Sequence, residues 1–174
     1  MIEAVKQPDA WLRGAVEGVP PYLVPAAHAF RQAAEDVQKA SLDLPPGTLW
    51  VKPGGAASPG FHMKHLAGST RRLLLYSRGG SLTDEMKKQM AAEGEADPSA
   101  DAQGLAAAAV AALEEAIDAL RATPSDSLLD AREVGKARLP TTVLGAIFHA
   151  AEHAQRHAGQ FVTTVKVIRG LGLS

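Results

Sequence analysis

Proline residues constrain this chain most, because they divide it into a few long segments that can each form a helix. The first segment follows Pro21 and Pro25, covers residues 26–41 and ends before Pro45. Proline disrupts a helix interior, since it lacks the amide hydrogen and its ring clashes with the preceding turn. Within this segment apolar residues recur at steps of three and four, which places them on one helical face. The sequence therefore predicts a first helix over residues 26–41.

Three more long segments have helical character. The first covers residues 58–76. The second begins at the start signals of residues 97–99 and ends near residues 122–124. The last covers residues 141–169. The third of the four helices is rich in alanine, the residue with the highest helix propensity. Thr141 or Thr142 is expected to cap the last helix. A shorter amphipathic helix is predicted over residues 82–93.

The remaining segments have the composition of connections. Residues 48–59 are rich in proline, glycine and serine, and residues 125–140 are polar, with a short extended piece expected at residues 132–134. Together these patterns predict an all-α fold, an up-and-down four-helix bundle with a short extra helix between helices 2 and 3. A chain of 174 residues has the size of one domain, which we expect to span residues 1–174.

The charge balance and the apolar runs exclude several kinds of partner. Lys and Arg total 18 against 19 for Asp and Glu, a net charge of -1, which disfavours binding to nucleic acid. The longest apolar run, residues 105–113, is too short to cross a membrane. Residues 1–10 lack the apolar core of a secretory signal. We therefore expect a cytoplasmic protein that binds neither nucleic acid nor membranes.

Histidines form the most informative cluster in the sequence. The chain has no cysteine, so any metal ligands must be histidine, aspartate or glutamate. His149, His153 and His157 follow one another at steps of four, which places them on one stripe of the last helix. At about 100° per residue, His157 and His153 point toward the core side and His149 leans toward the polar edge.

Two imidazoles one turn apart can share a metal ion, but a third ligand must come from another part of the fold. His65 is the best candidate, because it shares a helical stripe with Leu73 and Tyr76, which we expect to face inward. His62, one turn earlier, is the competing choice. The spacing alone also allows a surface cluster without a metal. The zincin motif is absent, because Ala154 stands where that motif has its general base.

Two motifs carry a resemblance to a known family. Residues 60–69 read GFHMKHLAGS, and residues 153–160 read HAQRHAGQ. In these motifs and in helix order, the chain resembles the DinB family, which includes the YfiT-like bacillithiol transferases. The resemblance implies a four-helix bundle that binds one divalent metal ion through one histidine of the second helix and two of the fourth. Carried over by motif, these ligands are His65, His153 and His157.

The chain departs from the family pattern at two positions beside these ligands. Family members often have an acidic residue after the first histidine of the fourth helix and a basic residue before the Gly-Gln pair. Ala154 and Ala158 occupy these positions here. The departures leave the ligand set intact and remove any catalytic group from its flanks, so no catalytic residue is predicted.

The resemblance implies a metal-dependent transferase of the thiol S-transferase type, or a hydrolase, with an open three-histidine site. Its substrate would be a small molecule, such as a low-molecular-weight thiol. Zinc, nickel, iron(II) and manganese all suit three imidazoles with open positions. The alternative is a non-enzymatic, stress-associated protein that binds metal or a small molecule. DNA-directed activity, suggested by the family's name alone, is opposed by the net charge.

Several other residues receive weaker assignments. Arg72 and Arg156 are candidates for orienting an anionic group, and Gln160 for bonding a ligand imidazole. The other residues expected near the site are His62, His149 and Tyr76.

Four further positions receive structural expectations. Trp11 and Trp50 are expected to pack as anchors, His28 to be exposed, and Gly159 to permit close approach of another helix. The smooth alanine surface of the third helix suggests a homodimer.

Overall fold

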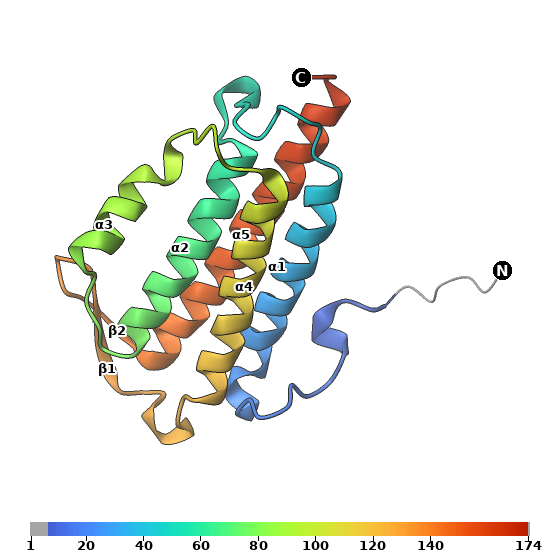
Figure 1. Ribbon diagram of the computed structural model, residues 1–174. Coiled ribbons are helices and arrows are strands. Elements are labelled where there is room, and N and C mark those ends of the chain that lie inside the picture. The colour runs from blue at the N-terminus through green and yellow to red at the C-terminus, as the bar shows by residue number, and fades with distance from the viewer. Residues whose placement is uncertain (1–6, 174) are drawn as a thin grey trace.

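Four long helices form a bundle in the computed structural model, which describes residues 7–173 (Figure 1). They are α1 (Val24–Leu42), α2 (Pro59–Ser77), α4 (Ala102–Arg121) and α5 (Val143–Gly170). The shorter α3 (Asp84–Ala91) lies beside the bundle. The predicted all-α four-helix bundle with an extra helix between the second and third long helices is confirmed. Short 3-10 helices occupy Ala10–Leu12, Pro21–Leu23, Pro53–Gly55, Ala92–Gly94 and Ser125–Ser127.

The long helices run up, down, down and up, so the strictly alternating up-and-down order predicted from the sequence does not hold for α2 and α4 (Figure 1). Arg169, at the end of α5, pairs with Asp43 at 3.0 Å, which places the ends of α1 and α5 together. Gln103, at the start of α4, donates to the carbonyl of Ser41 at 3.1 Å. Since α2 ends where α4 does, the connection that contains α3 must return along the bundle. This return is the physical reason for the extra helix.

Side-chain caps set the beginnings of α2, α3, α4 and α5. Ser58 accepts a hydrogen bond from the amide of Phe61, and Thr142 accepts one from Gly145, as capping residues do. The start predicted for the third long helix at residues 97–99 is wrong by one turn. Asp101 is its cap, because the Asp97 carboxylate instead accepts from the amide of Ser99 at 2.9 Å and closes a separate turn.

A small hairpin occupies part of the segment that was expected to be irregular. Strand β1 (Ala131–Val134) pairs antiparallel with β2 (Leu139–Thr142), with Ala131 opposite Thr142. The extended piece at residues 132–134 is thus confirmed, whereas β2 was not foreseen, and it contains Pro140, a residue that is unfavourable in most strands. The hairpin leads directly into α5 and holds the start of that helix beside the end of α2, where the Arg132 side chain donates to the Ser77 carbonyl.

The segment before α1 overturns two expectations. His28, expected to be exposed, is buried, because this segment covers its face of α1 and the His28 Nε2 lies 2.7 Å from the carbonyl of Gly14. Trp11, expected to be a packing anchor, is 68% exposed. Trp50 does pack against the core, and its indole nitrogen donates to the carbonyl of Asp97.

The core lies between the four long helices and is filled by aliphatic side chains, alanines and two phenylalanines. The largest completely buried side chains include Phe30, Met63, Leu113, Ile147 and Phe161. Among residues 7–173, no helix combines the length and the apolar character that crossing a membrane requires. Residues 1–10 were expected to carry no secretory signal. The structure describes only residues 7–10 of this stretch.

Candidate metal centre

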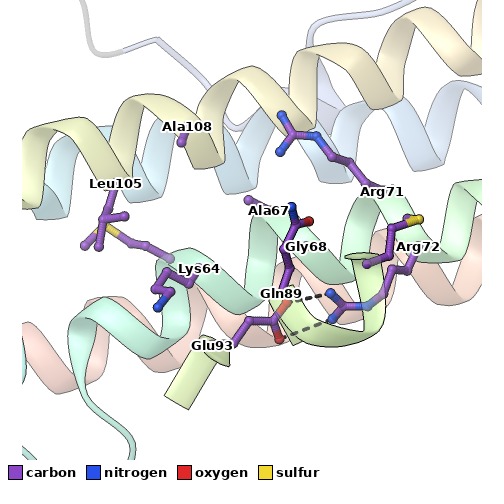
Figure 2. Close-up of a pocket in the computed structure, with 11 residues that line it drawn as sticks. Lys64, Ala67, Gly68, Arg71, Arg72, Gln89, Glu93, Leu105 and Ala108 are labelled. Atoms are coloured by element: carbon purple, nitrogen blue, oxygen red, sulfur yellow. Dashed lines mark hydrogen bonds and ion pairs between the residues drawn. The ribbon is translucent and has the colours of Figure 1, made fainter. Parts of the chain in front are cut away.

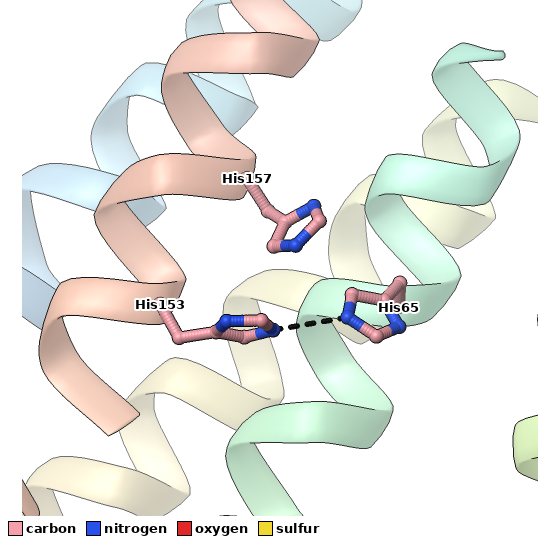
Figure 3. Close-up of side chains that lie close together, drawn as sticks. All are labelled: His65, His153 and His157. Atoms are coloured by element: carbon pink, nitrogen blue, oxygen red, sulfur yellow. Dashed lines mark hydrogen bonds between the residues drawn. The ribbon is translucent and has the colours of Figure 1, made fainter. Parts of the chain in front are cut away.

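Three histidines from two helices meet at the interface of α2 and α5 (Figure 3). His65 lies in the second turn of α2, and His153 and His157 lie one turn apart near the middle of α5. One ring nitrogen from each lies within 4.8 Å of the other two. The Nε2 atoms of His65 and His153 are 2.9 Å apart. The imidazoles that the sequence expected to come together therefore do so, at a separation that one metal ion can bridge.

Packing of α5 brings its histidines close to α2. Ala154 and Ala158, the two departures from the family pattern, are completely buried beside them in the core of the bundle. Small side chains at these positions let α5 approach its neighbours closely, and no charged group stands there.

Burial keeps two of the three imidazoles uncharged at neutral pH. The pKa of His153 is lowered to about 4 and that of His157 to about 3, chiefly by burial and then by the neighbouring His65. An imidazole can bind a metal ion only through an unprotonated nitrogen. These two rings therefore have lone pairs available without first losing a proton.

The second nitrogen of each ring has a different environment. His65 Nδ1 lies 2.7 Å from the Glu93 carboxylate, to which it can only donate. His157 Nδ1 lies 3.3 Å from Nδ1 of His62 and faces away from the other two rings, while its Nε2 faces them (Figure 3). His153 Nδ1 is buried and has no hydrogen-bond partner among residues 7–173. The first contact fixes a His65 tautomer whose Nε2 is free to bind an ion, and the second is compatible with the same tautomer of His157.

Glu93 is a member of the site that sequence reasoning missed. Its carboxylate lies between His65 and Arg72, whose guanidinium donates to it at 2.5 and 3.2 Å (Figure 2). Burial alone would raise the pKa of Glu93, but the hydrogen bonds from His65 and Arg72 outweigh it and lower that pKa. A fixed negative charge therefore orients His65.

Gly68 makes room for this ion pair. A Cβ atom on Gly68 would lie 2.6 Å from the Arg72 guanidinium and closer still to the Glu93 carboxylate. Arg72 was expected to be a candidate for orienting a substrate anion. That expectation is wrong, because Arg72 is buried and its guanidinium is occupied by Glu93.

An open groove crosses the outer face of α5 next to the histidines. We call it the α5 groove; it has a volume of about 860 Å³ and includes His62 and His157 in its lining. Arg156 and Gln160 lie exposed along it, and Arg156 pairs with Glu152. His62 also lines the groove but is buried, and the pKa of His62 is lowered to about 4, first by burial. These residues place solvent access on one side of the cluster.

The other residues assigned to the site vary in position. His149 is exposed, 5.5 Å from the ring of His153 between centroids, as its place on the polar edge predicted. Tyr76 lies three turns beyond His65, in a separate hollow near the hairpin, so its assignment to the site is wrong. Gly159 meets no other helix, because nothing lies within 4 Å of where its Cβ would be, so the expected close approach is also wrong. Phe61, not predicted, stacks on His65 with 5.1 Å between ring centroids.

The donor set fits a divalent transition metal. Three neutral imidazole nitrogens are the ligands of open zinc sites, and they also suit nickel, iron(II) and manganese. A protein that fills three positions leaves one or more for water or substrate. The α5 groove gives such a position access to solvent.

Comparison with known protein families supports the resemblance that the motifs suggested. Residues 22–161 match the DinB superfamily, a range that contains all three histidines and most of the bundle. Among curated proteins, no sequence matches this chain.

Proposed function

This chain belongs to the DinB superfamily, and from that premise we propose that it binds one divalent transition-metal ion through His65, His153 and His157. We propose further that it uses the ion in a transferase reaction of the thiol S-transferase type, or in a hydrolysis, on a small molecule. The observation that carries the proposal is the convergence of three imidazole nitrogens within 4.8 Å of one another beside an open groove.

The chain's own residues would each have a distinct part in this activity. When bound, the ion would supply Lewis acidity, which makes water or a thiol a stronger nucleophile at neutral pH. Glu93 holds His65 in one tautomer, and His62 would do the same for His157 when its Nδ1 accepts a hydrogen bond from the His157 Nδ1. Phe61 stacks on His65 and limits its movement. These contacts preorganise the ligands, which reduces the cost of arranging them around the ion.

Access to solvent favours a catalytic ion over a purely structural one. A structural zinc site has four protein ligands and is closed, whereas three histidines next to a groove leave a position for substrate. A non-enzymatic protein that binds metal or a small molecule remains the second candidate. It is favoured by the buried alanines at positions 154 and 158, where family members often have an acidic and a basic residue.

An activity assay on the metal-loaded protein distinguishes these candidates. Zinc-, nickel-, iron(II)- and manganese-loaded protein would be incubated with low-molecular-weight thiols and an electrophile such as monochlorobimane, and separately with activated esters. Catalysis predicts product formation that depends on the ion and is lost in His157→Ala but kept in His149→Ala. If the loaded protein forms no more product than the metal-free protein with any of these substrates, the transferase and hydrolase assignments fail and the non-enzymatic candidate stands.

A further inference from the structure

The α5 groove has a lining that is nearly free of charge. Around His62 and His157 it is formed by small, amide and hydroxyl side chains and by Phe61, so its surface is mainly apolar, and Arg156 is its single charged residue. Its other members are Ala56, Ala57, Phe61, Gln155, Gly159, Gln160, Thr163 and Thr164. Its volume of about 860 Å³ is in the range of sites that hold small organic molecules. The groove is therefore large enough for more than water.

Gly159 gives the groove its depth. It lies in the middle of a 28-residue helix, where glycine is the least favourable residue apart from proline. Its φ is not positive, and a Cβ at this position would meet nothing within 4 Å, so neither backbone strain nor close packing requires glycine here. The structural effect of this glycine is to keep the space above the helix open, beside His157 and Gln160.

Most polar groups of the lining are neutral. Gln155 donates one amide hydrogen to the carbonyl of Ala29 on α1 at 2.5 Å, and its side-chain oxygen is left as an acceptor. Gln160 and Thr163 are exposed along the same face of α5. Arg156 is neutralised by Glu152. Amide and hydroxyl groups of this kind complement a ligand's own hydroxyl and amide groups, whereas a polyanion would find one cation that is already paired.

A second hollow, between α2, α3 and α4, offers a contrast. Figure 2 shows the residues that line it. It has a volume of about 240 Å³, and its cationic side chains are occupied within the protein. Lys64 donates to the backbone carbonyl of Ala92, Arg71 pairs with Glu115, and Arg72 is held by Glu93. The α5 groove is the larger of the two and lies against the histidine cluster.

We infer that the α5 groove is the substrate site of the proposed metal centre, and that it takes a small, uncharged molecule that carries hydroxyl and amide groups. Gly159 forms its floor, Gln155 and Gln160 supply hydrogen bonds along it, and His62 also lines it. The inference rests on the proposed function and names the substrate class for it.

A binding experiment with a simple probe tests the inference. N-acetyl-L-serinamide, which has one hydroxyl and two amide groups, would be titrated into the 15N-labelled full chain, both metal-free and zinc-loaded. We expect saturable amide shifts at residues 56–62 and 155–164, with a dissociation constant of about 10 mM or tighter, as suits a probe of this size. N-acetyl-L-aspartate and 1-hexanol, the anionic and apolar probes, should bind at least about tenfold more weakly.

Two glycines of α5 provide matched variants. Gly159→Leu fills the groove, and Gly170→Leu adds the same side chain at another α5 glycine with nothing within 4 Å. Binding of the serinamide probe should weaken at least about tenfold in Gly159→Leu and stay unchanged in Gly170→Leu, while both variants keep their zinc. Absence of saturable shifts, equal binding to Gly159→Leu, or tighter binding of either other probe would overturn the inference. Failure to bind zinc in any form would instead overturn the proposed function.

Discussion

The two flanks of the histidine cluster differ in charge and in access to solvent. On one flank, Glu93 and Arg72 have side chains only 7% and 9% exposed and form an ion pair that touches His65. On the other flank, His62 contacts His157 and the α5 groove opens to solvent. The charged groups are thus buried, and the open side presents mainly neutral groups.

This difference separates two roles in the site, the orientation of the ligands and the admission of a substrate. A buried carboxylate interacts strongly with the ring that it orients, because little water screens it. A neutral, open flank can admit a substrate without a large cost of removing water from charged side chains. The ligands are therefore fixed from one side and approached from the other.

The largest expected effect comes from breaking the charged flank. Glu93→Gln leaves the Arg72 guanidinium buried without its counterion, which should lower the free energy of unfolding by about 3–5 kcal/mol. Losing the carboxylate that orients His65 should also weaken zinc affinity about 10- to 100-fold. Thermal or urea unfolding and competition with a chromophoric chelator measure the two effects.

The matched control for this variant is a surface ion pair between α2 and α4. Arg71 and Glu115 have side chains 45% and 57% exposed, so Glu115→Gln should cost about 1 kcal/mol or less and leave zinc affinity unchanged. Equal losses in the two variants would contradict the special role of the buried pair.

Acid should weaken the metal-free protein through the buried imidazoles. His62, His153 and His157 have pKa values of about 4, 4 and 3 in the folded chain, against an ordinary value of 6.5. The unfolded chain therefore takes up protons below pH 6.5 that the folded chain does not, so stability falls as pH decreases from 6.5 toward 4. The loss should be on the order of a few kcal/mol.

Urea unfolding at a series of pH values, with chelator present, measures this loss. His62→Phe removes one of these imidazoles from the open flank and should flatten the profile. An identical profile in this variant would show that His62 contributes nothing to the acid sensitivity.

The same substitution should have opposite effects on the two flanks. Gly68→Ala places a methyl group against Glu93 and Arg72 and should cost about 1–3 kcal/mol, as overpacking does. Gly159→Ala meets open space and should stabilise α5 by about 0.5–1 kcal/mol. Thermal unfolding of both variants measures the difference. A loss of stability in Gly159→Ala would show that this flank is packed more tightly than the structure indicates.

Much of this arrangement could be predicted from the sequence. Helical periodicity and proline positions indicated the four long helices, and the four-residue spacing placed His153 and His157 on one stripe. The meeting with His65 required the family motif, because periodicity alone left His62 as an alternative. The structure shows why both were reasonable, since each of the two contacts a histidine of α5.

The sequence could not reveal Glu93 or the α5 groove. Glu93 follows the excursion through α3, and local periodicity says nothing about where a connecting segment returns to the bundle. The groove depends on the absence of a side chain at Gly159, and a helical glycine is equally consistent with close packing. The homodimer suggested by the alanine-rich helix stays a prediction. Some alanines of this helix, such as Ala109 and Ala112, are buried inside the bundle and cannot contact a partner.

Metal stoichiometry tests the central claim most directly. Protein stripped with chelator would be dialysed against zinc, and its zinc content per chain measured for the natural sequence and for alanine variants of single histidines. We predict one ion per chain in the natural sequence and in His149→Ala, and a loss of nearly all bound zinc in His65→Ala, His153→Ala and His157→Ala. Zinc-free natural protein, or full occupancy in those three variants, would contradict the account.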